Sequence, residues 1–405
     1  MPVPAETTAH PLRCLLAIPA FRRLWAVGGI ANAMRWVEVL VAAIWTFEAT
    51  GSAFAVSLVA LMRALPMLLL GAAAGALAEL LDRKKLLVVG QAANGLGALG
   101  ILLLALGGAL EVWHLAAQGF LGGLVWTGEM ASRRRMLTEV AGERDVVTAV
   151  AFDSLTANTT RMAGPLLGGA IYQFLGLPAG FALAALGYGL TCTLLAGVVH
   201  TQARRRFGPR LLLAEMADAL RVVRRMKPLQ AVILITIAMN IFGFCFVAVL
   251  PAFGAAAFAA SPVQIGMLTA AEPAGALLTG LVLASRRGVP LSPALMLGGG
   301  AGFLLCLLLL AMVPSLPLAL GVLMLGGIGT ALFAALQTAL PVTQAPPEAR
   351  SRVLGLVTTC IGMGPTGQLA IGALADSLGP AAAIPIMAGL GLLMVAGTAW
   401  QTLRP

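Results

Sequence analysis

Apolar residues along this chain come in runs of about twenty positions, separated by short charged or Pro/Gly-containing breaks. Runs of that length suit a helix that crosses a hydrocarbon layer of about 30 Å, whereas membrane-spanning strands alternate over about ten residues. The breaks define twelve predicted spans, at 22–46, 56–79, 86–109, 112–132, 146–174, 178–199, 229–253, 262–285, 291–313, 317–343, 351–375 and 380–402. The pattern therefore predicts an all-α membrane protein with twelve transmembrane helices.

Composition supports a membrane protein and excludes several other classes. Of the 405 residues, 60% are hydrophobic and only 10% are charged, whereas soluble domains average about a quarter charged residues. A water-soluble globule lacks the polar surface to cover such a chain. The five cysteines are scattered singly and the three histidines stand near the chain's beginning or at span ends. We therefore expect no disulfide framework, no metal site and no cofactor.

Basic residues are confined to one side of the predicted spans. With twelve spans, 23 of the 26 Lys and Arg residues fall on the side that holds both termini, while the opposite loops carry acids such as Glu48, Glu111 and Asp376. The positive-inside rule places that side, and both termini, in the cytoplasm. The net charge of +10 is thus a topology signal, and we expect the lipid bilayer rather than nucleic acid as partner.

The two halves of the sequence resemble each other. Gly164-Pro165 in the fifth span is matched by Gly364-Pro365 in the eleventh, six spans later. A parallel duplication of this kind predicts two pseudosymmetric six-helix bundles, residues 1–200 and 229–405, with a ligand cavity between them near the midplane. The segment 201–228 between them is predicted to be an amphipathic cytoplasmic linker on the anionic inner leaflet. We expect a monomer.

Several segments resemble the major facilitator superfamily. Gly75-Ala-Leu-Ala-Glu79-Leu-Leu-Asp82-Arg83-Lys84-Lys85 is similar to the signature between the second and third spans of that family. Trp45 followed by Glu48-Ala-Thr-Gly-Ser52 resembles the branch of bacterial enterobactin exporters and drug-efflux proteins. The resemblance implies the major facilitator fold, a bacterial cytoplasmic (inner) membrane location and secondary active transport by alternating access. It favours proton-coupled export, by antiport, of a small amphipathic or anionic compound such as a drug or siderophore-like metabolite.

The resemblance also assigns a conformational latch at the cytoplasmic end of the second span. It implies that Glu79 binds the positive end of the eleventh span's helix dipole in the outward-facing state. Gly75, Asp82 and Arg83 complete the motif. In the alternative interpretation these residues serve topology alone, with Arg83 anchoring the loop.

A second motif, Arg161-Met-Ala-Gly164-Pro165-Leu-Leu-Gly168-Gly169, resembles the fifth-span signature of the same superfamily. Pro165 removes a backbone hydrogen bond, so that we expect a kink. Gly164, Gly168 and Gly169 are expected to make a close, bendable contact with the other half. Packing without a role in transport is the alternative.

Polar residues inside spans mark further candidates, because a charge in hydrocarbon costs several kcal/mol unless it faces protein or water. The candidates for substrate binding are Asn32, Arg35, Arg63, Asn158, Arg161, Asn240, Gln337 and Gln368. The candidates for proton coupling are Glu272, Glu38 and Asp153. Glu272 ranks first because its own half offers no cation at matching depth, so that a proton or a first-half arginine must neutralise it. The structural alternatives are an Arg35–Glu38 pair and, for the uncharged residues, ties between helices.

Other functions are less well supported by the sequence. No convergent nucleophile and base and no phosphate-binding loop are present, so neither an enzyme nor an ATP-driven pump is predicted. The three arginines within spans favour an anionic group on the substrate. No residue encodes the direction of transport, so an importer or facilitative carrier of a small organic solute, or a lipid transporter on the same fold, remains an alternative.

Overall fold

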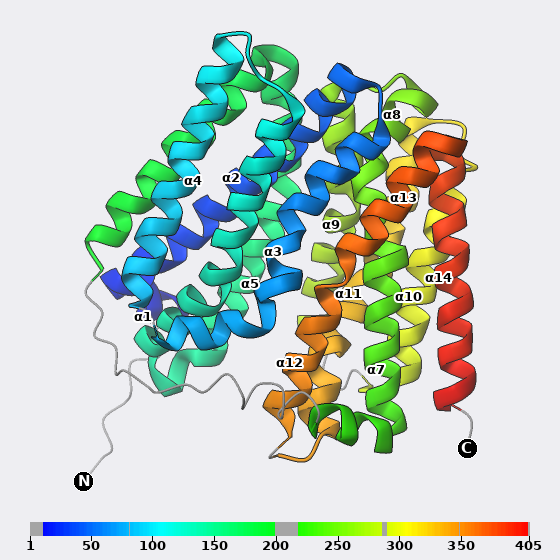
Figure 1. Cartoon of the computed structure of the whole chain (residues 1–405). Helices are drawn as coiled ribbons and strands as arrows, with labels where there is room; N and C mark the ends of the chain where they lie inside the picture. Colours follow the sequence, from blue (N-terminus) through cyan, green and yellow to red (C-terminus); the bar gives the residue numbers. More distant parts are fainter. Residues whose placement is uncertain (1–10, 81, 199–217, 286–289, 348, 404–405) are drawn as a thin grey trace.

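The computed structural model describes residues 11–80, 82–198, 218–285, 290–347 and 349–403; within these ranges, the side chains of 11–13, 71–80, 131, 143–144, 284, 351 and 403 are outside the description. The first half of the molecule consists of α1 (Pro11–Ala17), α2 (Pro19–Thr50), α3 (Ala53–Leu80), α4 (Arg83–Leu106) and α5 (Val112–Ala196). The second half consists of α7 (Lys227–Ala238), η1 (Met239–Gly243), η2 (Phe244–Val249), α8 (Leu250–Phe258), α9 (Pro262–Ser285), α10 (Pro293–Leu310), α11 (Leu316–Gln344), α12 (Arg350–Ile361), α13 (Gly364–Leu378) and α14 (Pro380–Leu403). Figure 1 shows the two halves side by side.

Within the described residues these elements make twelve passes, as the hydropathy pattern predicted. The long α5 supplies three of them, because its backbone leaves the helical conformation at Gly142 and Gly176. Both glycines have positive φ, 75° and 74°, which a residue with a Cβ adopts only under strain. In the second half, the run from α7 through η1 and η2 to α8 makes one pass, and α12 with α13 makes another (Figure 1).

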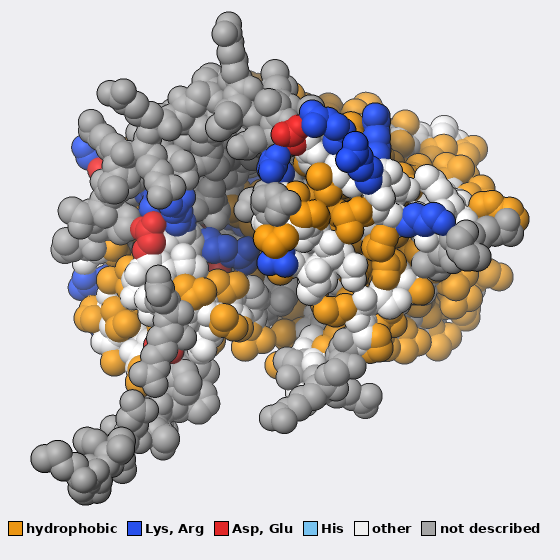
Figure 2. Space-filling model, turned by 90° about the horizontal axis from the view of Figure 1, so that it is seen from below, with side chains coloured by type: hydrophobic (Ala, Val, Ile, Leu, Met, Phe, Trp, Pro, Cys, Tyr) orange, Lys and Arg blue, Asp and Glu red, His pale blue; other side chains and the backbone are white. Residues whose placement is uncertain are grey.

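Charge and hydrophobicity divide the surface as a bilayer requires. Basic side chains gather at the end of the molecule where α1 begins and α14 ends, which we call the basic end; Figure 2 views this face. The opposite end, here the far end, carries Glu48, Glu111 and Asp376. Between the two ends, large apolar side chains such as Leu96, Leu186 and Leu393 are about 70% exposed, at 69%, 73% and 71%. Such a band faces acyl chains in a bilayer.

The two halves are closed against each other at the far end. Asp376 at the end of α13 accepts hydrogen bonds from the Ser52 hydroxyl (2.6 Å) and from the Phe54 backbone N–H (3.0 Å) at the start of α3. The Gln173 side chain of α5 accepts a bond from the backbone N–H of Val263 in α9 (3.1 Å). Beneath these polar contacts, Leu40 of α2 packs with Ile265 of α9 in a small buried apolar cluster.

Between the halves, the linker is described only from residue 218. Residues 218–225 are helical, and the buried Ala219 and Val223 show that this turn packs against protein, with Val223 joining the core of the second half. Asp218 also pairs with Arg352 of α12 (3.0 Å). The predicted linker residues 201–217 lie outside the described residues.

Candidate functional site

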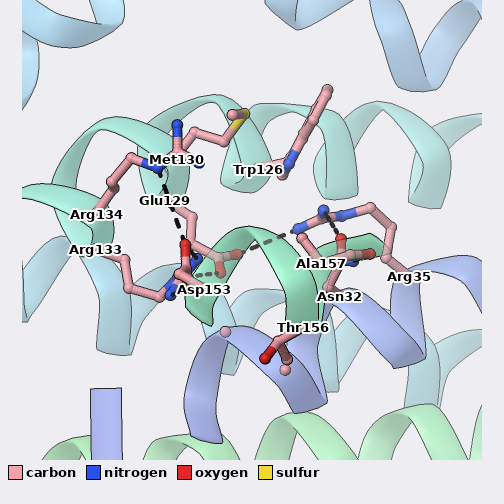
Figure 3. A pocket seen from close by; sticks show the side chains of 12 residues that line it. Asn32, Arg35, Trp126, Glu129, Met130, Arg133, Arg134, Asp153, Thr156 and Ala157 are labelled. Carbon is pink, nitrogen blue, oxygen red and sulfur yellow. Dashed lines mark hydrogen bonds and ion pairs between the residues drawn. The ribbon is translucent and has the colours of Figure 1, made fainter. Parts of the chain in front are cut away.

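A pocket of about 140 Å³ lies within the first half, between α2 and the first two passes of α5 (Figure 3). Its lining is unusually charged for a membrane protein interior. The lining residues are Gly28, Gly29, Asn32, Arg35, Trp126, Glu129, Met130, Arg133, Arg134, Asp153, Thr156 and Ala157. Three arginines face two carboxylates, so the side chains that line the pocket have a net charge of one positive unit.

Arg35 is held in this pocket from three directions. Its guanidinium donates to the Asn32 side chain (2.7 Å) and to Glu129 (3.3 Å), and it lies 5.1 Å from the ring centroid of Trp126. Asn32 in turn donates to the Thr160 hydroxyl (2.6 Å). Because α2 places Asn32 and Arg35 one turn apart, both side chains leave the same helix face. The cation is therefore positioned before any ligand arrives.

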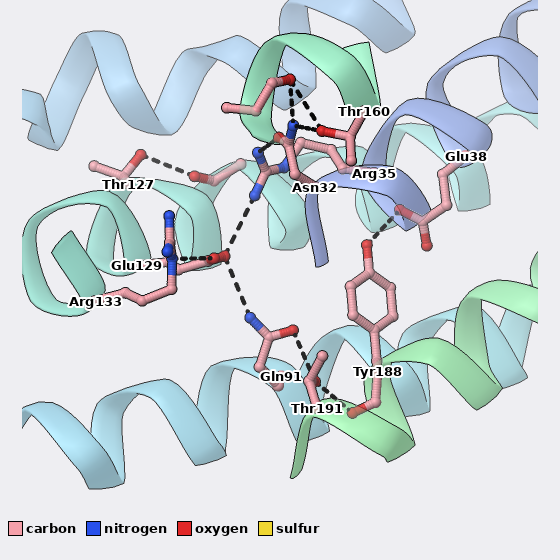
Figure 4. Close-up of polar contacts among 12 residues, drawn as sticks. Asn32, Arg35, Glu38, Gln91, Thr127, Glu129, Arg133, Thr160, Tyr188 and Thr191 are labelled. Carbon is pink, nitrogen blue, oxygen red and sulfur yellow. Dashed lines mark hydrogen bonds and ion pairs between the residues drawn. The ribbon is translucent and has the colours of Figure 1, made fainter. Parts of the chain in front are cut away.

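Glu129 is the centre of this polar cluster (Figure 4). It accepts from Arg35 and from Gln91 of α4 (3.2 Å), and its second oxygen lies 3.4 Å from Nε of Arg133. Arg133 donates both terminal nitrogens to Asp153, at 2.7 and 3.2 Å. This two-pronged geometry is the strong form of an arginine–carboxylate contact.

Gly28 makes room for that arrangement. A Cβ at this position would collide with the guanidinium of Arg133, whose far end is held by Asp153 and cannot move without losing its partner. A glycine on α2 thus allows a charged group from α5 to lie against the helix backbone.

A second ion pair lies deeper in the first half. Glu38, only 1% exposed, pairs with Arg63 of α3 (3.1 Å) and accepts from the Tyr188 hydroxyl (3.3 Å; Figure 4) and the Gln118 amide (3.4 Å). A buried pair tolerates its loss of water only when further hydrogen bonds complete it. Tyr188 and Gln118 fulfil that condition.

The third ion pair joins the two halves near the middle of α9 and of the second pass of α5. Arg161 of α5 donates to Glu272 of α9 (2.7 Å), and the Thr330 hydroxyl of α11 donates to the other carboxylate oxygen. Glu272 is buried, whereas 30% of the Arg161 side chain is exposed. Glu272 is therefore neutralised by a first-half arginine rather than by a cation of its own half.

Comparison with known proteins gives this arrangement a family. Residues 9–404 match the profile of the transmembrane secretion effector family of the major facilitator superfamily (MFS). The chain belongs to this family. It is a secondary transporter of the MFS type and not an enzyme.

Similar proteins agree with that assignment. The uncharacterised MFS-type transporter YfiS of Bacillus subtilis (strain 168) is 24% identical over 161 residues, a match covering 40% of this chain and only 37% of that relative. The solved structure of a POT family transporter in complex with 5-aminolevulinic acid has a TM-score of 0.76 at 11% identity, over 95% of this chain and 96% of that one. A bacterial homologue of the human lysosomal transporter Spinster, inward-facing and occupied, has a TM-score of 0.74 at 14% identity, over 98% of both chains. These structures show the shared fold.

Among the uncharged candidates for substrate binding in this MFS transporter, Asn32 lines the pocket and the others lie outside its lining. Gln337 of α11 donates to the Thr236 hydroxyl of α7 (3.1 Å) and so ties two second-half helices together. Asn240 donates to the Thr236 backbone carbonyl one turn earlier in its own pass (2.9 Å). The Gln368 side-chain oxygen is buried and has no hydrogen-bond partner within the described part of the chain. Asn158 is exposed on α5 and is not part of the pocket lining.

The fifth-span glycines contact different partners from those expected. Gly164 and Gly168 face α2 of their own half, at Trp36 and Val37, while only Gly169 lies against the second half, at Pro262. The helix continues through Pro165, and the non-helical residues of α5 are Gly142 and Gly176. Gly169, together with the Pro165 carbonyl that lies against Gly266 of α9, makes the expected contact with the other half; for Gly164 and Gly168 that expectation is wrong in this conformation, because α2 lies against them. The kink at Pro165 stays a prediction, because a proline can bend a helix whose φ/ψ angles remain helical.

The latch residues are only partly described. The side chains of Gly75 and Glu79 lie outside the described residues. Asp82 caps its own helix, α4, by accepting from the Lys85 backbone N–H (3.1 Å), and Arg83 pairs with Glu139 of α5 (2.9 Å). In this conformation both described residues are engaged inside the first half.

Sequence reasoning missed residues that complete the site. Glu129 and Arg133 stand near the end of an apolar run, where a charge reads as a topology signal, yet their side chains are only 6% and 12% exposed. Trp126 and Thr330 carried no signal, because single aromatic or hydroxyl residues are common within spans. A helical wheel of the fourth span could have placed Trp126, Glu129 and Arg133 on one face.

Proposed function

We propose that this MFS transporter exports a small amphipathic, anionic compound across the bacterial cytoplasmic membrane in exchange for protons, working as a monomer with both termini in the cytoplasm. The observation that carries the proposal is the Arg161–Glu272 ion pair, which crosses between the halves near the middle of the helices that carry it. The family description as a secretion effector supports export. The far-end closure then corresponds to a conformation that is shut toward the outside.

The ion pair offers a physical basis for obligatory exchange. A proton on Glu272 removes the negative charge of the pair. A substrate anion bound to Arg161 takes the place of Glu272 as the partner of the arginine. Either ligand therefore frees the halves at this point, whereas the empty transporter keeps the pair and stays in its conformation. An antiporter needs this property, because an empty carrier that switched sides freely would dissipate the gradient.

The latch around Glu79 belongs to the same proposal. When the far end opens, the basic end must close, and an acid at the end of α3 facing the N-terminus of α12 stabilises that closure through the helix dipole. Gly75 permits the close approach of the two helices. Asp82 and Arg83 then position the loop through the contacts to Lys85 and Glu139 described above.

The experiment begins with a thermal-shift screen of purified protein against siderophores, lipids and drugs, which selects a ligand for transport in proteoliposomes. In the wild-type protein, we expect an imposed pH gradient to drive accumulation of that ligand. Glu272→Gln breaks the pair permanently, so this variant should carry the ligand down its own gradient and ignore the pH gradient. Intact gradient-driven transport by Glu272→Gln would exclude Glu272 as the proton carrier. Ser285→Ala, at the end of the same helix, serves as the control.

A further inference from the structure

We infer that the first-half pocket binds the carboxylate of a small amphipathic monoanion, at a subsite separate from Arg161. This inference rests on the proposed function in one respect only, namely that the ligand is a transported anion. The pocket lies on the basic-end side of the Arg161–Glu272 pair and belongs entirely to the first half. It is therefore suited to receive the charged group of a ligand before the two halves rearrange.

Unused hydrogen-bond donors are the first argument. Nε of Arg133 is buried and makes no hydrogen bond to any described residue, although it lies 3.4 Å from an oxygen of its ion-pair partner Glu129. Arg134 is 46% exposed, lies 3.9 Å from Asp153, and makes a long hydrogen bond of 3.5 Å to Ser154. Its guanidinium is thus the least firmly bound cation of the pocket. A carboxylate accepting from Arg134 would satisfy donors that the protein itself satisfies poorly.

Charge balance selects the valence of the ligand. Arg35, Arg133 and Arg134 exceed Glu129 and Asp153 by one positive charge. One additional negative charge neutralises the pocket, whereas a dianion would confront the two carboxylates and a cation would add to the surplus. Because Arg133, Glu129 and Asp153 are at most 12% exposed, their charges are less screened than charges in water, and this difference affects affinity.

Size and shape complete the description of the ligand. About 140 Å³ is less than the roughly 300–1,000 Å³ of a site that encloses a whole drug-sized ligand. The pocket therefore holds one end of a molecule. Trp126 and Met130 supply an aromatic and a flexible apolar wall beside the arginines (Figure 3), so a carboxylate attached to a flat ring fits both parts of the lining.

The test compares three probes of similar size, 1-naphthoate, 1-naphthylmethylamine and 1-naphthyl phosphate, by isothermal titration calorimetry on the purified full-length protein in neutral detergent. We expect saturable binding of naphthoate and at least about tenfold weaker binding of the amine and of the doubly charged phosphate, since a charge-assisted hydrogen bond contributes enough for such a ratio. Lack of naphthoate binding to folded protein, or equal binding of the amine, would overturn the inference.

Two variants locate the site. Arg134→Gln removes a charge that is 46% exposed and makes only long contacts within the protein, and should weaken naphthoate binding about tenfold. Arg221→Gln, 69% exposed at the basic end, should leave naphthoate binding unchanged. Gly28→Ala changes no charge but displaces the Arg133 guanidinium, and should also weaken binding, whereas Gly100→Ala, with open space around it, should not. Unchanged affinity in both pocket variants would refute the assignment.

The binding test stays separate from the transport test. Naphthoate binding requires no gradient and should persist in Glu272→Gln, because that residue is outside the pocket. Binding with uncoupled wild-type transport would contradict the proposed proton exchange and leave the subsite intact. Gradient-driven transport of a screened anion that does not compete with naphthoate would contradict the subsite and leave the exchange intact.

Discussion

Asp376 offers a direct perturbation of the balance between the two conformations. It stands at the end of α13 in the second half and accepts two hydrogen bonds from the start of α3 in the first half, from Ser52 and from the Phe54 backbone N–H. A carboxylate at a helix N-terminus also interacts favourably with the helix dipole. Both contributions exist only while the far end is closed. Asp376→Asn therefore weakens the closed conformation without altering either half internally.

The size of the effect follows from the exposure of the contact. A hydrogen bond to a charged group contributes about 1.5–3 kcal/mol when shielded from water. Asp376 is exposed, so solvent screening weakens both bonds, and the asparagine oxygen can still accept one of them; we therefore expect Asp376→Asn to cost about 1–2 kcal/mol. That free energy corresponds to about a five- to thirtyfold rise in the ratio of far-end-open to far-end-closed molecules. Ser52→Ala removes one of the two bonds and should give a smaller rise.

Double electron–electron resonance measures this ratio directly. In a background without the five native cysteines, spin labels replace Leu106 and Met312, which are 68% and 79% exposed at the far end of opposite halves. Asp376→Asn should enlarge the long-distance population. Ser377→Ala is the matched control, because its hydroxyl bonds only to carbonyls of its own helix among the described contacts. An unchanged distance distribution in Asp376→Asn would refute the reasoning.

Two further predictions concern stability. Arg63→Met leaves Glu38 buried without its ion-pair partner, so the thermal unfolding midpoint should fall by an amount equivalent to about 3–5 kcal/mol. The double variant Arg63→Met/Glu38→Leu should recover most of this loss. A midpoint of the double variant as low as that of Arg63→Met would show that the unpaired carboxylate does not cause the loss of stability. Gly142→Ala forces a Cβ onto a backbone with φ of 75° and should cost about 1–3 kcal/mol, measured against Gly100→Ala; equal midpoints would show that the turn tolerates a side chain.

The number of spans could be predicted from the sequence because two independent signals agree. Hydropathy locates apolar runs, and segregation of basic residues checks the count, since one missed span would have mixed the two sides. The glycine turns within α5 fall at Gly142 and Gly176, inside the breaks that charge and proline had marked. Membrane solvation imposes these features on the sequence directly, so they remain readable without any structure.

The pairing of charges could not be predicted in the same way. Arg35 and Glu38 stand three positions apart and could pair on one helix, yet Arg35 turns to Glu129 and Glu38 to Arg63. Helical spacing fixes which face a residue occupies, but the partner on that face belongs to another helix whose rotation the sequence leaves open. For Glu272 the sequence narrowed the choice of partner, because its own half has no cation at a matching position. A first-half arginine was therefore one of the two expected ways to neutralise it, and Arg161 does pair with it.

The far-end contact has a counterpart in the sequence at the basic end. The pattern Gly-Ala-Leu-Ala followed by an acid occurs twice, at 75–79 near the end of α3 and at 372–376 near the end of α13. These two helices run antiparallel, so each acid stands where one helix ends and the other begins. At the far end Asp376 caps α3, and Gly372 permits close approach to Ser57. The same chemistry at Glu79 would cap the N-terminus of α12 in the opposite conformation.

If the two copies act as opposing latches, their variants must have opposite signs. Glu79→Gln should raise the far-end-closed population by a factor similar to the one by which Asp376→Asn lowers it, since each removes one acid from one helix N-terminus. The double variant should then return the spin-label distances between 106 and 312 to the wild-type distribution. A Glu79→Gln variant that opens the far end, or a double variant that matches Asp376→Asn alone, would show that the basic-end motif serves topology and leaves the conformational balance to other contacts.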